Sequence, residues 1–201
     1  MAPALARLLA PPGSDAAVVV RLLDSPVGAL AAAATDDGLV FLEFATNERL
    51  ERQVGGLFRA FGPTRTGEHP VLDQTATELA EYFAGTRHQF RLPLVIRGTP
   101  FQERVWRALL GIPYGETRSY ADLAESLGVR NGQRAVGLAN GMNRLAIVVP
   151  CHRVIERSGG LRGYGGGLWR KKHLLDHEAR WAPAGALAGL PLAQGPTIGQ
   201  P

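Results

Sequence analysis

The sequence predicts an α/β protein of the α+β kind, with a small sheet and helices in its N-terminal half and a mostly helical C-terminal half. Three observations lead to this prediction. Apolar segments alternate with turn residues up to residue 44, apolar residues then recur at helical spacing, and Gly and Pro divide the second half into short helices. The 201 residues suffice for two domains of about a hundred residues each.

Three strands are predicted at the start of the chain, at residues 16–23, 28–35 and 39–44. Each is rich in apolar or β-branched residues, and a Ser-Pro pair and an Asp-Gly pair supply the turns between them. Such a pattern predicts a meander within a small mixed or antiparallel sheet. A further short strand at residues 92–95 is expected to rejoin it.

Two helices are predicted between these strands, at residues 46–58 and 72–84, because their apolar residues recur at spacings of three and four. Their acidic residues fall at helical spacings that suit a solvated face better than a catalytic arrangement: Glu48, Glu51, Glu78 and Glu81. The buried face of the second helix is predicted to carry Leu72, Ala76, Leu79, Ala80 and Phe83.

The C-terminal half begins with a helix over residues 100–110, for which Thr99 is the N-cap and Pro100 the first residue. Its predicted buried stripe is Phe101, Val105, Trp106, Leu109 and Leu110. A last helix, residues 168–178, is predicted to turn Leu168, Leu174 and Leu175 inward.

Two short helices lie between these, at residues 120–127 and 133–140, with Ser119 as the N-cap of the first and a glycine turn between them. This is the spacing of a helix-turn-helix, although ordinary helical hairpins share it. Alanine and glycine on the second helix allow close approach to a nucleic-acid backbone, while Arg134 projects from it.

Charge and composition narrow the possible partners. Residues 96–182 carry 14 Arg and Lys against 7 Asp and Glu, a net of +7, so the rest of a chain whose total is +4 carries −3. A basic half suits contact with a polyanion.

No apolar run approaches the roughly 18–20 residues of a membrane span, so no membrane partner is expected. A single cysteine excludes an internal disulfide and suits the reducing cytoplasm, and the preference for Arg over Lys suits a GC-rich bacterial genome.

The lone cysteine lies in the pentapeptide Pro150-Cys151-His152-Arg153-Val154. A single cysteine is more often a small core residue, but polar neighbours favour a reactive thiol here. Because Pro150 ends the apolar run 145–149, the thiol is expected at a strand edge.

A base must help the thiol ionise, and His152 is the candidate. Neighbours in an extended segment point to opposite sides, so His152 needs a bridging water or a sharp turn to reach Cys151. Glu178, on the last helix, is the predicted carboxylate that orients the imidazole.

Taken together, these residues resemble a known family. Six segments occur in the order and spacing of the O6-alkylguanine-DNA alkyltransferases: Ile112-Pro113-Tyr114-Gly115, Ser119-Tyr120, Arg134-Ala135-Val136-Gly137, Asn143, the thiol pentapeptide, and Gly163-Tyr164-Gly165-Gly166-Gly167-Leu168. The resemblance is close over residues 99–178 and looser before them. It implies an RNase H-like N-terminal domain and a winged-helix-like helix-turn-helix in the C-terminal domain.

The resemblance implies an irreversible, stoichiometric repair reaction, in which Cys151 takes the alkyl group from O6 of a guanine that is flipped out of double-stranded DNA; O4-alkylthymine remains open as a second substrate. It implies no cofactor and no metal, and a monomer in solution, with cooperative assembly on DNA left open. The expected domains are an N-terminal tail (1–15), a supporting domain (16–96), a DNA-binding alkyl-acceptor domain (97–182) and a C-terminal tail (183–201).

The family motifs also assign roles to residues. The implied relay runs from Cys151 through a water to His152 and Glu178, and Asn143 orders the turn that presents the thiol. Arg134 would replace the flipped nucleotide, and Tyr120 would rotate its phosphate. The implied base pocket comprises Tyr120, Val154, Tyr164 and Gly165, with Trp106 close by. The implied DNA-contacting residues are Tyr120, Ala121, Gln133, Arg134, Ala135, Gly137 and Arg157.

Two residues depart from the family pattern. Arg144 replaces a common proline, which predicts a looser turn before the thiol or a more basic approach to it. Gly165 replaces serine or alanine, which predicts a roomier pocket. Two other functions compete with repair: a non-catalytic lesion-binding module, which the presence of Cys151 disfavours, and a thiol hydrolase, which would turn over.

Overall fold

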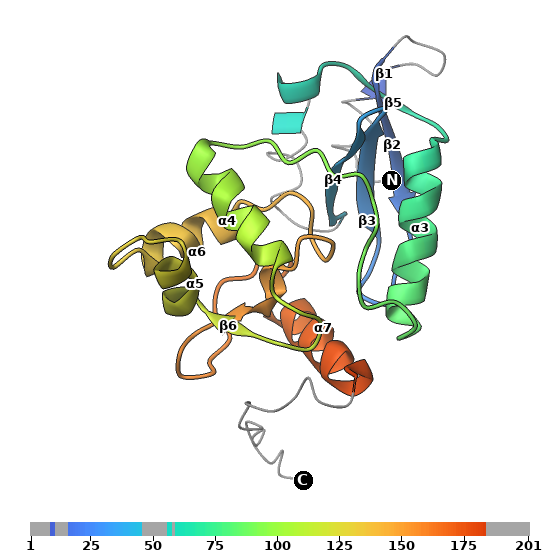
Figure 1. The fold of residues 1–201 in the computed structure, drawn as a ribbon. Helices are drawn as coiled ribbons and strands as arrows, with labels where there is room; N and C mark the ends of the chain where they lie inside the picture. The colour runs from blue at the N-terminus through green and yellow to red at the C-terminus, as the bar shows by residue number, and fades with distance from the viewer. Residues whose placement is uncertain (1–8, 11–15, 46–55, 58, 184–201) are drawn as a thin grey trace, which may run out of the picture.

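The computed structural model describes residues 9–10, 16–45, 56–57 and 59–183 (Figure 1). The N-terminal half holds a five-stranded sheet in the order β1-β5-β2-β3-β4. As predicted, β2, β3 and β4 form an antiparallel meander, while β5 pairs in parallel with both β1 and β2 and makes the sheet mixed. The strands are β1 (Leu9–Ala10), β2 (Val18–Leu23), β3 (Leu30–Thr35), β4 (Gly38–Phe44) and β5 (Thr64–Thr66).

The sheet differs from the sequence predictions at three places. Residues 9–10, within the predicted N-terminal tail, form a strand that pairs with β5. The polar Thr-Arg-Thr strand β5 was not predicted, because it has no apolar run of its own. The strand expected at residues 92–95 is reduced to a parallel bridge between Leu94 and Leu39.

Helix α3 (Pro70–Phe83) packs beside the sheet (Figure 1). Leu72 and Leu79 are buried as predicted, but Ala80 is exposed and Tyr82 is buried in its place. Glu78 was predicted to be solvated and is buried. It accepts hydrogen bonds of 2.8 Å from Gln74 Nε2 and from the amide of Arg91, so it anchors the loop after the helix.

The helix predicted at residues 46–58, with Glu48 and Glu51, lies largely outside the described residues. Within the part that the structure describes, residues 56–57 and 59–61 are helical.

The C-terminal half contains the predicted helices. Thr99 and Ser119 each form a capping box, with Gln102 and Asp122 respectively. Two short strands pair in parallel beside the helices, in the manner of a small wing. The elements are α4 (Pro100–Leu110), β6 (Arg118–Ser119), α5 (Tyr120–Ser126), α6 (Gln133–Gly141), the 3-10 turn η1 (Cys151–Arg153), β7 (Val154–Ile155) and α7 (Leu168–Trp181).

Two predicted helix faces are partly wrong. On α4, Leu110 is 43% exposed, because Leu109 takes the inward position at that end. On α7, Leu168 is 48% exposed, and the buried face instead carries Lys171, Leu174 and Glu178. That face therefore carries a lysine and a glutamate beside Leu174, so α7 brings charge into the interior.

The sheet and the helical half meet at β4. The amide of Leu42 donates to the carbonyl of Arg144, and the amide of Ala146 donates to the carbonyl of Leu42, each at 2.8 Å. The apolar run 145–149 is therefore a bridge followed by turns. Ile147 has a φ of 70°, an unfavourable conformation for a β-branched residue, and it lies four residues before the thiol. No helix among the described residues is long and apolar enough to cross a membrane.

Candidate active site

Cys151 opens the 3-10 turn η1 and is buried, with 6% of its surface exposed. The prediction of a strand edge is therefore wrong, because the chain turns sharply at Pro150. Asn143 holds this turn: its Nδ2 lies 3.1 Å from the Cys151 Sγ and donates to the Val149 carbonyl at 2.9 Å, while its Oδ1 accepts from the Leu145 amide at 3.0 Å. The turn is thus closed by hydrogen bonds from Asn143, and a looser turn at Arg144 stays a prediction.

Burial raises the pKa of the Cys151 thiol to about 11, although the Asn143 hydrogen bond and the charge of Lys171 oppose the shift. The nearby Glu43 raises this pKa further. The resting thiol is therefore protonated at neutral pH and depends on a base to react.

His152 and Glu178 form a buried pair beside the thiol. His152 Nε2 lies 2.7 Å from Glu178 Oε1, and neither side chain is more than 1% exposed. Burial lowers the pKa of His152 even though Glu178 opposes this shift, so the ring is neutral at rest. Its Nε2 then donates to Glu178, and its Nδ1, which has no partner within the described part of the chain, is the free basic nitrogen.

Glu178 accepts more donors than the sequence indicated. Arg153 donates through Nε at 2.8 Å and Nη2 at 3.0 Å, the Gly115 amide donates at 3.2 Å, and the Tyr82 hydroxyl donates at 2.8 Å. Burial alone would raise the pKa of Glu178, but His152 and Arg153 hold it well below its usual range. Glu178 therefore remains ionised and orients His152 without accepting its proton.

Arg153 was missed as a functional residue, although it belongs to the thiol pentapeptide. Its side chain is buried, its Nη1 donates to the Ile112 carbonyl at 2.6 Å, and its guanidinium lies 5.7 Å from the ring of Tyr114. Arg153 lies only two residues after the lone cysteine. This position in the sequence could have indicated it as a partner for Glu178.

A pocket opens over Cys151 between β4, the end of α6 and the glycine loop. Of the residues predicted for the base pocket, Tyr164 and Gly165 line it, whereas Tyr120 and Val154 do not. The loop packs tightly on the sheet, because a Cβ at Gly166 would lie 2.4 Å from the ring of Phe44. The lining comprises Glu43, Phe44, Asn140, Gly141, Asn143, Ala146, Cys151, Gly163, Tyr164, Gly165 and Gly166.

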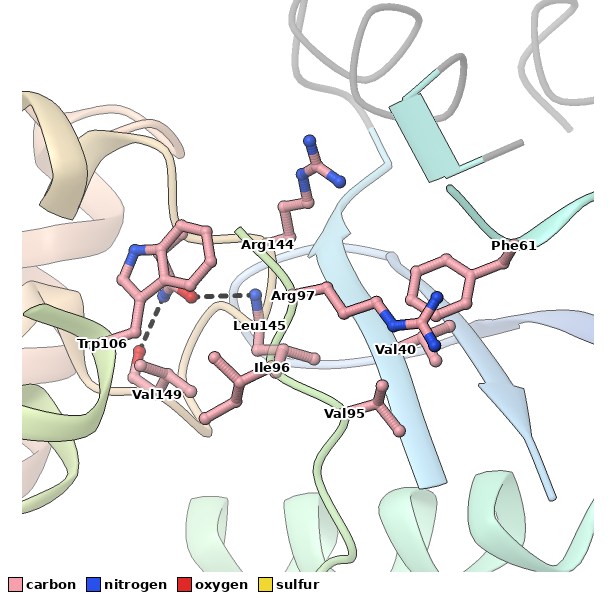
Figure 2. Close-up of a pocket in the computed structure, with 10 residues that line it drawn as sticks. Val40, Phe61, Val95, Ile96, Arg97, Trp106, Arg144, Leu145 and Val149 are labelled. Atoms are coloured by element: carbon pink, nitrogen blue, oxygen red, sulfur yellow. Dashed lines mark hydrogen bonds between the residues drawn. The ribbon is translucent and has the colours of Figure 1, made fainter. Parts of the chain in front are cut away.

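Trp106 does not line the thiol pocket, contrary to its predicted place near the base. It lines the seam between the two halves with Val40, Val95 and Leu145 (Figure 2), and its Nε1 donates to the Ala139 carbonyl at 2.8 Å. The dashed lines in Figure 2 end at Leu145 and Val149, the two residues whose backbone groups bond to the Asn143 side chain.

Arg144 also lines this seam and not the thiol pocket (Figure 2). A Cβ at Gly56 would lie 3.4 Å from its guanidinium, so the side chain reaches toward the N-terminal half. The more basic approach to the thiol that this residue predicted is therefore not found.

Lys171 is a second residue near the thiol that was not predicted from the sequence. It is fully buried, and its Nζ donates to the carbonyls of Val154 at 2.6 Å and Arg162 at 3.2 Å. Its Nζ lies 5.7 Å from the centre of the Tyr120 ring. Burial lowers the pKa of Lys171 to about 8. Lys171 lies three residues before Leu174, so the two share a face of the helix, and this spacing could have indicated that Lys171 is buried.

The predicted DNA-contacting residues lie around α5 and α6. Gln133, Arg134, Ala135 and Arg157 are exposed, whereas Ala121 and Gly137 are half-buried. A Cβ at Gly137 would lie 3.7 Å from the ring of Tyr120, so α6 lies against that tyrosine. The Tyr120 hydroxyl donates to the Arg162 carbonyl at 3.3 Å, and Tyr120 therefore stands between α6 and the loop that lines the pocket. Val154 is buried, and its carbonyl accepts a hydrogen bond from Lys171 Nζ.

Two family models match the chain and together span most of it. Residues 18–96 match the ribonuclease-like domain of 6-O-methylguanine DNA methyltransferase, and residues 100–180 match its DNA-binding domain. The chain belongs to this methyltransferase family.

Individual relatives agree with this family assignment. A methylated-DNA–protein-cysteine methyltransferase of Mycolicibacterium paratuberculosis is 52% identical over 82% of this chain and 94% of the relative. A solved O6-methylguanine methyltransferase of Mycobacterium tuberculosis is 46% identical, with a TM-score of 0.71 over 83% of this chain and 96% of that one. A structure of the M. tuberculosis OGT in complex with DNA is 44% identical, with the same TM-score and coverage. These methyltransferase structures match the two-part α/β fold.

Proposed function

We propose that this chain is a single-use DNA repair protein, which flips O6-alkylguanine out of duplex DNA and transfers the alkyl group irreversibly to Cys151. The observation that carries this proposal is a buried thiol, held by Asn143 beside a neutral His152 that is paired with the ionised Glu178, in the lining of a pocket next to the end of α6. An O6 atom inside the base stack could not be approached in line by such a thiol, so the base must leave the stack.

The proposed chemistry begins at the thiol. Because Nδ1 of His152 is its free nitrogen, a water between Nδ1 and Sγ can carry the thiol proton to the imidazole. The sulfur then forms a bond to the alkyl carbon as the bond from that carbon to O6 breaks, and guanine leaves with the electron pair and takes up a proton. The product is a stable thioether, so no step regenerates the thiol and each chain reacts once.

The proposed DNA contacts use the exposed face of α6. Arg134 enters the space of the flipped nucleotide, and Tyr120 turns its phosphate toward the pocket. Gln133, Ala135, Gly137, Ala121 and Arg157 contact the strands beside the lesion. Lys171 holds the Val154 carbonyl in place for the base and brings a positive charge near Cys151.

We further propose that the chain acts in the bacterial cytoplasm, on double-stranded DNA and without a cofactor, as a monomer in solution. A reducing compartment keeps the free Cys151 available for reaction. Assembly of several copies on DNA and reaction with O4-alkylthymine are open extensions, to be tested by gel shift and with a thymine lesion.

One experiment separates repair from the two competing functions. The protein is incubated with an excess of duplex DNA that contains a single O6-methylguanine, and its intact mass is measured. Repair predicts one added methyl group per chain and none in Cys151→Ser. Multiple turnovers would indicate a thiol hydrolase, and binding without an adduct would indicate a lesion-binding module; either result refutes the proposal.

Gly165 sets a second test, of substrate size. We propose that its lack of a side chain widens the pocket that it lines, so benzyl adducts react well relative to methyl adducts. Rates on the two adducts are compared in the native chain and in Gly165→Ser. A strong native preference for methyl over benzyl would contradict the roomier pocket.

A further inference from the structure

Tyr82 brings the N-terminal domain into contact with the centre of the active site. Its side chain is fully buried on α3, and its hydroxyl donates to Glu178 Oε1 at 2.8 Å, across 96 residues of sequence. The same oxygen lies 2.7 Å from His152 Nε2 and accepts a hydrogen bond of 3.0 Å from Arg153 Nη2. The imidazole therefore shares its acceptor with a phenol from the other domain.

Donors that share the Glu178 carboxylate with His152 are expected to lower the pKa of His152. The Glu178 carboxylate stabilises the protonated form of His152, and this stabilisation weakens when other donors neutralise part of the carboxylate charge. Arg153 supplies one such donor set and Tyr82 supplies another. A neutral His152 is the form that can accept the thiol proton, so donors on Glu178 favour the reactive form.

We propose that Tyr82 is a positioning residue for the acceptor reaction: by donating to Glu178 it fixes the carboxylate and limits its pull on His152, so that the imidazole stays neutral and ready to accept the thiol proton. This inference rests on the relay proposed above. Tyr82 acts through Glu178 and does not line the pocket over Cys151. The N-terminal domain would then take part in the chemistry as well as in support.

The titratable and charged groups that face the His152–Glu178 pair come from several elements. They are Tyr82 on α3, Tyr114 after α4, Cys151 and Arg153 in η1, and Lys171 on α7. Tyr114 provides a matched control. It is also buried near Glu178, and burial followed by the charge of Glu178 raises its pKa to about 12. Its hydroxyl has no hydrogen-bond partner within the described residues, so it lacks the bond that Tyr82 makes.

The test compares Tyr82→Phe with Tyr114→Phe, since both keep the aromatic ring and remove only a hydroxyl. The pKa of His152 is measured by NMR of its ring nitrogens, and rates are measured with free O6-benzylguanine and with lesion-bearing duplex between about pH 5 and 8. Tyr82→Phe is expected to raise the His152 pKa by about one unit. The reaction then slows about tenfold on the acidic limb of the pH–rate profile, equally for both substrates, and the rates converge at higher pH. Tyr114→Phe is expected to match the native chain.

Three outcomes overturn the inference: an unchanged His152 pKa in Tyr82→Phe, a loss of rate that is uniform across pH, or the same shift in both variants. His152→Gln, measured in parallel, separates this inference from the relay on which it rests. If that variant reacts at the native rate, the relay itself is absent. If it is inactive while Tyr82→Phe shows no shift, the relay stands and only the role of Tyr82 is lost.

Discussion

Glu178→Gln gives the sharpest test of how the charges inside this protein are balanced. The substitution keeps the shape of the side chain but removes the carboxylate that faces two nitrogens of the buried Arg153. A guanidinium left buried without its partner costs about 3–5 kcal/mol, out of a total stability of about 5–15 kcal/mol. For a domain of this size, a few kcal/mol lowers the melting temperature by roughly 10 °C.

The pH dependence of stability follows from the lowered pKa of Glu178. A carboxylate whose pKa is lower in the folded than in the unfolded chain contributes stability that is fully present above the unfolded value, near 4.5, and that is lost as pH falls below it. Glu178→Gln should therefore be less stable at neutral pH and should lose less additional stability on acidification than the native chain does.

Urea unfolding followed by tryptophan fluorescence, at neutral pH and in acid, measures both effects. Glu68→Gln, at an exposed position, is the control and should change stability by less than about 0.5 kcal/mol. A loss below about 1 kcal/mol in Glu178→Gln, or an acid response like that of the native chain, would refute the charge balance described for Arg153 and Glu178.

Three further predictions concern separate parts of the site. Arg134→Ala should slow repair of duplex DNA by at least about tenfold while leaving the reaction with free O6-benzylguanine unchanged; equal losses on both substrates would exclude the proposed insertion. Lys171→Met removes a charge that lowers the pKa of Cys151, so the reaction should slow about tenfold and its alkaline limb should move to higher pH; an unchanged profile would contradict this role. Trp106→Phe should cost about 1 kcal/mol in urea unfolding, through loss of its bond to Ala139, with a native repair rate; a slower reaction at native stability would place Trp106 in the base site after all.

Local signals in the sequence determined most of the secondary structure. Thr99 and Ser119 cap their helices through contacts within three residues, and the Asp-Gly turn joins β3 to β4. These features depend on neighbours along the chain, so a single sequence reveals them. The sequence also placed Cys151, His152 and Glu178 among the candidate residues, the first two because they form one motif and the third because it is a carboxylate on the last helix.

Tertiary packing decided the rest. Lys171 and Glu178 share a helix face with Leu174, and only carbonyls and donors from distant segments make the burial of their charges tolerable. Trp106 was predicted to be buried, but the sequence could not show that it faces the seam between domains.

The partners of the relay show this division most clearly. The sequence by itself indicated the proposed nucleophile Cys151, the proposed base His152 and the helix that carries Glu178. The tertiary structure alone decided that Glu178 also accepts a hydrogen bond from Tyr82, 96 residues away, and that His152 is buried and neutral. The physical reason is that the ionisation of a buried group depends on every donor and charge around it, and chain folding brings these together from segments that are unrelated in sequence.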